Sequence, residues 1–278
     1  MVFFLIGGLQ RQKRLRLLVQ CIKRDNPDII LLQEMPIALL FFNMILFCGD
    51  FLKLRKELQE LGYTYHTDPL QSFNEKSEEY GNFLEWIFGR LYNHGLVIFS
   101  KLPITASHTR VFSPKYRRYF RWRGFLCAQV QINGTSNLHI INTHLETTNC
   151  QAKLGQINAI KQYVLTRIKA KDIDLGRDHL LIAGDFNICS NYTWDSHLHV
   201  SERMYTILCE NMKEIGLGDD LFANAKKTFW YNNSDESLDH MFVSGKLFSK
   251  IKHKEVVDYK DNVRHVSDHL GLWAEFEI

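Results

Sequence analysis

The sequence lacks the features that divide a chain into separate parts. It holds five prolines in 278 residues, and no proline-rich or low-complexity stretch interrupts it. No internal repeat is visible either. Because a linker is normally marked by such a shift in composition, we expect a single domain over residues 1–278.

Paired cysteines are also lacking. The six cysteines are scattered, and none stands in the Cys-x-x-Cys spacing that marks many zinc sites. This distribution favours reduced, mostly buried thiols in a reducing compartment over a disulfide framework. The positions are Cys21, Cys48, Cys127, Cys150, Cys189 and Cys209.

No apolar run in the sequence is long enough to span a membrane. The longest run, residues 37–48, falls well below the roughly 20 residues of a spanning helix. We expect this run to form a core helix or a segment that dips into a membrane surface. The apolar N-terminus has no basic residue before it, which makes it a poor signal peptide. We therefore expect a cytoplasmic location. Association with a membrane surface through the apolar run is a further expectation.

Excess charge of one sign is nearly absent. The formal net charge is +3, which is too small to argue for a nucleic-acid partner by itself. Hydrophobic residues make up 45% and charged residues 23%, as in an ordinary globular protein with a sizeable core.

The pattern of apolar residues predicts helices and strands along the whole chain. Helical spacing covers residues 10–24, 52–61, 151–169 and 202–215. Short apolar runs predict strands at residues 29–32, 96–99, 126–132, 138–142, 180–183, 238–243 and 270–276. Asn133-Gly134 supplies a turn between the third and fourth of these. The order indicates an α/β (α+β) fold with two packed mixed sheets flanked by helices.

Acidic and amide side chains end two of these strands. Glu34 follows the run at residues 29–32, where its oxygens could reach a hard divalent cation. Asp185 follows Gly184, which lets the backbone turn sharply after the strand. Asn187 lies two residues further on. On extended backbone it would share a face with Asp185, so that carboxylate and amide converge on metal and phosphate.

Histidines and further acids stand at the other strand ends. His144 lies in the segment Asn-Thr-His-Leu-Glu and could donate to a phosphate oxygen, or be a packed core histidine. Asp239 opens the strand at residues 238–243. Asp268 and His269 precede the last strand, where the histidine would be a general base beside a carboxylate.

Taken in order, these motifs resemble the endonuclease/exonuclease/phosphatase superfamily from about residue 3 to the C-terminus. The resemblance implies a four-layered α/β-β/α sandwich and hydrolysis of a phosphodiester with Mg²⁺, or Mn²⁺ in its place. Glu34 would be the principal metal ligand, with Asp268 next to the metal site. One position departs from the pattern: Leu5 stands where superfamily members have an asparagine ligand. A catalytically impaired, phosphate-binding relative is therefore an alternative.

The resemblance also implies catalytic roles. Asp185 and Asn187 would hold and orient the water nucleophile and the phosphate. His144 would donate to a non-bridging phosphate oxygen. His269 would be the general base, or would hydrogen-bond the phosphate, with Asp239 orienting its ring. Such a site offsets charge, positions water and supplies donors to the equatorial oxygens.

Two substrate classes stay open. Residues 93–104 and the Asn-Thr-His-Leu segment are similar to the neutral sphingomyelinase-like branch, and Lys153 stands where that branch tends to have arginine. The apolar segments at residues 37–48 and 83–92 could serve a phospholipid substrate, the favoured partner, through peripheral membrane contact. A monomer is expected.

The rival class is a nuclease or a tyrosyl-DNA phosphodiesterase-like repair hydrolase. Residues 115–123 alternate basic and aromatic side chains, which can follow a nucleic-acid backbone and stack on bases. Residues 144–147, His-Leu-Glu-Thr, are similar to the corresponding segment of tyrosyl-DNA phosphodiesterase 2. In either class we expect Lys153 and Arg123 to contact the substrate.

Overall fold

The computed structural model describes residues 2–4, 11–35, 38–41, 44–47, 49–67, 95–113, 123–191, 199–230 and 235–278. Three of the sequence predictions lie outside these residues. They concern Leu5, the aromatic segment at residues 83–92, and residues 115–122 of the basic stretch.

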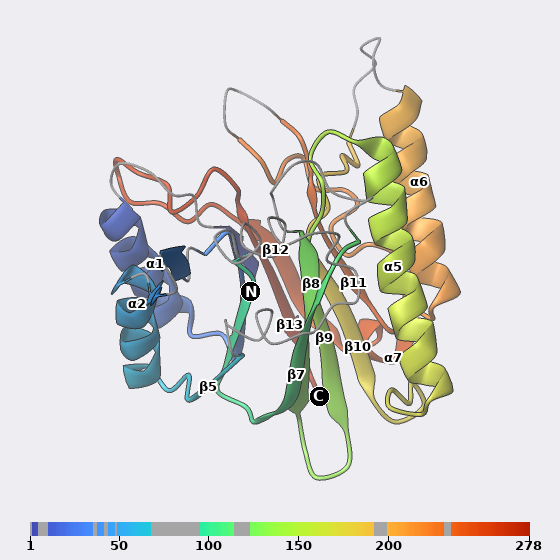
Figure 1. The fold of residues 1–278 in the computed structure, drawn as a ribbon, viewed down its shortest axis with the longest axis horizontal. Helices are drawn as coiled ribbons and strands as arrows, with labels where there is room; N and C mark the ends of the chain where they lie inside the picture. Colours follow the sequence, from blue (N-terminus) through green and yellow to red (C-terminus); the bar gives the residue numbers. More distant parts are fainter. Residues whose placement is uncertain are drawn as a thin grey trace.

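The first sheet has six strands in the order β12-β13-β1-β2-β6-β5. They are β12 (Ile251–Val257), β13 (Gly271–Phe276), β1 (Val2–Phe4), β2 (Ile29–Gln33), β6 (Val97–Ser100) and β5 (Tyr65–His66). Helices α1 (Arg11–Asp25) and α2 (Gly49–Glu60) cover its outer face, seen at the left of Figure 1. The core under these helices includes Leu18, Ile22 and Leu58, none of which is exposed.

The second sheet has five strands in the order β11-β10-β9-β8-β7. They are β11 (Asp239–Val243), β10 (His179–Asp185), β9 (Asn137–His144), β8 (Gly124–Gln131) and β7 (Ile104–Val111). Helices α5 (Cys150–Lys169) and α6 (His199–Glu214) lie over its outer face, at the right of Figure 1. The short helix α7 (Gly245–Phe248) follows β11.

The two sheets pack against each other through apolar side chains from both. Leu31 and Ile98 of the first sheet share a core with Leu126, Ile140 and Leu181 of the second. Each sheet is mixed, since β1–β2 and β9–β10 pair in parallel and the other pairs within both sheets are antiparallel. The predicted fold class, two packed mixed sheets flanked by helices, is confirmed.

For the longest apolar run, the core-helix alternative is wrong, and contact with a membrane surface stays a prediction. Residues 37–48 contribute strands β3 (Ala38–Phe41) and β4 (Met44–Phe47), which pair antiparallel as a separate two-stranded sheet, instead of a core helix. Residues 37–48 are apolar at every position except Asn43, so they have neither a helical nor a strand period, and periodicity alone could not distinguish the two. In the part of the chain that the structure describes, no helix is long and apolar enough to cross a membrane.

The other predicted elements are present with small shifts at their ends. Asn133 makes the predicted turn between β8 and β9, where its Oδ1 accepts from the backbone N–H groups of Thr135 and Ser136. Strands β5, β7 and β12 were not predicted. The five cysteines that the structure describes form no disulfide with one another.

Candidate active site

The register of the second sheet brings three of the predicted site residues to the same level. Asp185, at the end of β10, is the cross-strand partner of His144 on β9 and of Asp239 on β11. Cross-strand partners project from the same face of a sheet, so the three side chains lie side by side. The sequence placed each residue at a strand end, and strand pairing places the ends together.

Gly184 is required for this arrangement. Its φ is +151°, and a Cβ built on it would lie 1.9 Å from the carbonyl oxygen of Thr143 on the neighbouring strand. No larger residue can occupy the position without moving β9 away from β10. The close approach of these strands is what sets Asp185 beside His144.

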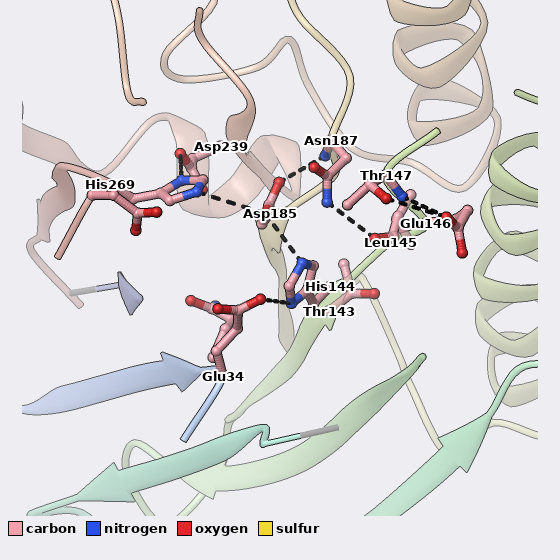
Figure 2. A network of polar contacts seen from close by, with 12 residues as sticks. Glu34, Thr143, His144, Leu145, Glu146, Thr147, Asp185, Asn187, Asp239 and His269 are labelled. Atoms are coloured by element: carbon pink, nitrogen blue, oxygen red, sulfur yellow. Dashed lines mark hydrogen bonds and ion pairs between the residues drawn. The ribbon is translucent and has the colours of Figure 1, made fainter. Parts of the chain in front are cut away.

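The side chains form a continuous polar network, drawn in Figure 2. Asp185 is central: its Oδ2 lies 3.2 Å from Nε2 of His144 and 4.0 Å from Nε2 of His269. On the other side of His144, Nδ1 lies 3.8 Å from Oε1 of Glu34. On the other side of His269, Nδ1 lies 2.9 Å from Oδ2 of Asp239. The predicted metal ligand, both histidines and two acids therefore converge on one site.

The electrostatics of the site make His269 a cation at neutral pH. Burial opposes its charge, but the carboxylates of Asp239, Asp185 and Asp268 outweigh burial and raise the pKa of His269 to about 10. Burial also raises the pKa of Asp239, while His269 acts in the opposite direction. A protonated His269 suits the predicted role as hydrogen-bond donor to phosphate better than the predicted role as general base.

The pKa of Asp185 is lowered, whereas that of His269 is raised. Burial disfavours its charge, but His144, His269 and the backbone N–H of Asn187 hold the pKa of this carboxyl well below its usual range. An ionised Asp185 can only accept, so Nε2 of His144 carries the hydrogen. Burial and the charge of Arg123 lower the pKa of His144, which keeps its ring neutral. Its Nδ1, without a hydrogen-bond partner, then presents a lone pair, and this tautomer favours an acceptor or ligand over the predicted phosphate donor.

Glu34 reaches the site on strained backbone. Its φ is 54°, in the left-handed region that is uncommon for residues other than glycine. The next residue, Met35, donates its N–H to the carbonyl of Gly95. Gly95 also has positive φ, and a Cβ there would lie 2.6 Å from the Met35 nitrogen. This close backbone contact turns Glu34 out of the sheet, and its side chain is 41% exposed.

The expectation of extended backbone between Asp185 and Asn187 is wrong. Asn187 has φ of 50°, so the backbone leaves the strand after Asp185 and the two side chains do not share a face by alternation. Instead, the N–H of Asn187 donates to Oδ1 of Asp185, and its side-chain amide donates to the carbonyl of Leu145. The Lys153 ammonium donates to the carbonyl of Asn187. Buried Lys153 thus supports this turn, and its predicted substrate contact stays a prediction.

The predicted metal residue Asp268 and the predicted substrate residue Arg123 lie around the polar network of the site. Asp268 accepts from the hydroxyl of Ser267, and its backbone carbonyl accepts from Trp230. Among the residues that the structure describes, no group of three or more histidines, cysteines and acids is gathered so as to hold a metal. Arg123 is buried and lies near enough for its charge to lower the pKa of His144, so this predicted substrate residue belongs to the site's surroundings.

Three supporting residues were missed from the sequence. Gln33 and Asn142 hydrogen-bond between the two sheets directly behind the site. Phe229 lies against the ring of His269, with 4.8 Å between ring centroids. The motif Asn-Thr-His-Leu contained Asn142, but nothing in the sequence paired it with Gln33. Phe229 carries no signal at all, since an aromatic residue next to other aromatic residues, as in Phe229-Trp230-Tyr231, is ordinary.

Comparison with known proteins identifies the architecture. The model of the endonuclease/exonuclease/phosphatase family matches residues 4–269. A family protein from Leptotrichia buccalis C-1013-b is 18% identical, with a TM-score of 0.64, covering 100% of this chain and 99% of that chain. Sphingomyelinase C from Streptomyces griseocarneus is 15% identical, with a TM-score of 0.61, covering 95% and 91%. A truncated Caenorhabditis elegans TDP2 is 16% identical, with a TM-score of 0.61, covering 98% and 94%. No curated protein sequence matches. At these identities the structural likeness shows the fold.

Proposed function

Because the chain belongs to the endonuclease/exonuclease/phosphatase family, whose members hydrolyse phosphoester bonds, we propose that it is a cation-dependent phosphodiester hydrolase. One observation carries the proposal. The ionised carboxylate of Asp185 lies between two imidazoles, 3.2 Å from His144 and 4.0 Å from His269, and Glu34 completes the row.

The donor set fits a divalent cation that takes few protein ligands. Mg²⁺ typically binds through one or two carboxylates, several waters and substrate phosphate oxygens, and so does not require a group of three acids. Glu34 would hold the cation. The unpartnered Nδ1 of His144, 3.8 Å from the Glu34 carboxylate, is a further possible ligand and would suit Mn²⁺ as well. When bound, the cation offsets the negative charge of the phosphate.

The protein side chains would each have a separate role in the reaction. The Asp185 carboxylate would orient the attacking water and accept its proton. The protonated His269 would donate to a phosphate oxygen, with Asp239 holding its ring through Nδ1. Removing a donor of this kind typically costs about 10²–10³ in kcat. Lys153 would keep the turn that carries Asn187 in place.

We favour a phospholipid headgroup diester as the substrate. Three features support it. The fold is similar to that of sphingomyelinase C, and residues 93–104 resemble the sphingomyelinase-like branch. In addition, every cross-strand pair of β3–β4, such as Leu39 with Leu46, is apolar, which suits contact with lipid.

A nucleic-acid substrate is the second candidate. It is supported by the similar fold of TDP2 and by the basic and aromatic composition of residues 115–123. Peripheral membrane contact and a monomeric state belong to the first proposal. The third candidate, a catalytically impaired phosphate-binding protein, is supported by Leu5.

The test measures release of phosphocholine from sphingomyelin vesicles beside cleavage of a labelled DNA strand, each with Mg²⁺ and with a chelator. Asp185→Asn and His269→Gln serve as site variants. Metal-dependent lipid turnover that is lost in both variants supports the first proposal. DNA cleavage alone supports the second, and the absence of both, with retained phosphate binding, supports the third.

A further inference from the structure

A second histidine–aspartate pair lies behind the site, where no role has been assigned to it. His240 follows Asp239 on β11, and successive residues of a strand point to opposite faces. Asp239 therefore faces His269, while His240 projects to the other side of the sheet. His240 is completely buried, and its ring packs near Phe186, Tyr205 and Phe242.

Both ring nitrogens of His240 are used, and both partners are acceptors. Nδ1 lies 2.7 Å from Oδ2 of Asp220, and Nε2 lies 2.6 Å from the carbonyl oxygen of Ile188. A neutral imidazole has one donor and one acceptor, so it cannot donate to a carboxylate and a carbonyl together. The contacts are satisfied when both nitrogens carry hydrogen, which makes the ring an imidazolium.

Asp220 is arranged as the counter-ion. Its Oδ1 accepts from the backbone N–H groups of Phe222 and Met241, each at 3.1 Å, and its Oδ2 accepts from the Tyr205 hydroxyl at 3.1 Å as well as from His240. Four donors thus surround one carboxylate. A buried ion pair is stable only when its remaining hydrogen-bonding groups are satisfied in this way.

The partner of Nε2 connects this pair to the proposed catalytic turn. Ile188 is the third residue after Asp185 and directly follows Asn187. The same turn is tied to the two residues that precede β11 by hydrogen bonds from the Phe186 N–H to the Leu238 carbonyl and from the Ser190 N–H to the Ser237 carbonyl. Within this set, His240 supplies the charged bond, which is stronger than a neutral one.

We propose that His240 is a positioning residue, a permanently protonated imidazolium that holds the turn at residues 185–188 and thereby orients Asp185 and Asn187 for the reaction. The polar side chains that contact the His240 ring are Asp220 and Tyr205, and Asp239 is its neighbour along β11. Burial opposes its charge, yet Asp220, the bond to Ile188 and Asp239 together raise the pKa of His240. The catalytic part of the proposal rests on the proposed function; the protonation state does not.

The first test is independent of activity. In full-length protein with ¹⁵N-labelled histidines, NMR reports whether each ring nitrogen carries hydrogen, and His240→Gln identifies the signal. We expect both nitrogens of His240 to carry hydrogen at neutral pH, above the ordinary histidine pKa of 6.5. A ring with one protonated nitrogen at neutral pH would overturn the proposal. Asp220→Asn removes the counter-ion at constant size and should yield such a neutral ring.

The second test separates positioning from general stability. His240→Gln should speed hydrogen exchange at residues 186–190 while leaving β8 and β9 unchanged, and should lower kcat on bis(p-nitrophenyl) phosphate about 10- to 100-fold with KM nearly constant. His253→Gln, at an exposed histidine on β12, should change neither. Faster exchange throughout the protein would show a merely structural role and overturn the proposal. If the wild type is inactive, the proposed function fails, and the NMR and exchange results still decide the role of His240 in the turn.

Discussion

Gln33 and Asn142 join the two sheets through a completely buried hydrogen bond, with 2.6 Å between Nε2 of Gln33 and Oδ1 of Asn142. Asn142 also donates to the carbonyl of Leu32, at 3.0 Å. Glu34 directly follows Gln33, and His144 lies two residues after Asn142. This amide pair therefore sets the separation between the proposed metal ligand on one sheet and the histidine on the other.

Removal of the amide pair should cost stability and activity together. Asn142→Leu leaves the Gln33 amide and the Leu32 carbonyl buried without their partner, which typically costs about 1–3 kcal/mol. We expect Gln33→Leu with Asn142→Leu to cost less than the sum of the two single changes, since the pair is removed as a unit. Urea unfolding measures this, with exposed Asn262→Ala as the control. Strict additivity would contradict the shared role.

Gly184→Ala should be among the most damaging single changes. The added Cβ would meet the Thr143 carbonyl at 1.9 Å, and alanine disfavours a φ of +151°. We expect a loss of more than about 3 kcal/mol in the free energy of unfolding, or displacement of Asp185 with loss of activity. Gly134→Ala is the matched control, because nothing lies within 4 Å of its Cβ. Equal melting temperatures for the two variants would contradict the close approach.

Glu34 should carry most of the cation affinity. Glu34→Gln is expected to weaken Mn²⁺ or Mg²⁺ binding at least about tenfold, because it removes the charged oxygen donor at constant shape. Isothermal titration calorimetry measures this without an activity assay. Glu57→Gln, at a surface ion pair of α2, is the control. Unchanged affinity in Glu34→Gln would place the cation elsewhere.

The pH profile should distinguish the two roles predicted for His269. With a pKa of about 10, a donor role predicts that kcat is maintained through pH 7–9 and falls as the pH approaches 10. A general-base role requires the neutral ring, and so predicts a kcat that rises tenfold per pH unit over the same range. Initial rates in saturating substrate measure this, and His269→Gln should have no such titration.

His108 should make the protein less stable in mild acid. Burial, with Arg167 and Arg110, lowers the pKa of His108 from 6.5 to about 4. Because the folded pKa lies below the unfolded one, the stabilisation is complete above pH 6.5 and is lost as the pH falls from 6.5 to 4. His108→Gln should flatten the dependence of the urea midpoint on pH in that window. An unchanged slope would show that other groups dominate.

The residue types of the site could be predicted from the sequence because they follow a local pattern. Apolar runs buried on both faces, as in β2 and β10, differ clearly from the polar residues that end them. Glu34, Asp185 and His269 could therefore be assigned to strand ends, and their order along the chain resembles one family. No assumption about distant contacts was needed.

Three strands that the pattern of apolar residues did not predict share one position. Strands β5, β7 and β12 all lie at the edges of their sheets. An edge strand exposes much of its surface, so it tolerates residues such as those of Ile-Lys-His-Lys-Glu in β12 and carries no apolar run. Such a strand forms because it pairs with the backbone N–H and C=O groups that its neighbour would otherwise leave unpaired. Only the folded sheet provides those groups.

The sequence by itself determined which side chains stand at strand ends, since burial of a strand imposes its composition locally. Only the tertiary structure decided which of them meet. Strand register set Asp185 between His144 and Asp239, and the amide pair across the sheets brought Glu34 to His144. The contacts on which the proposed protonation of His240 rests come from there too, because its partners, Asp220 and Ile188, lie in other parts of the chain. Such contacts depend on distances between segments far apart in sequence, which no local pattern encodes.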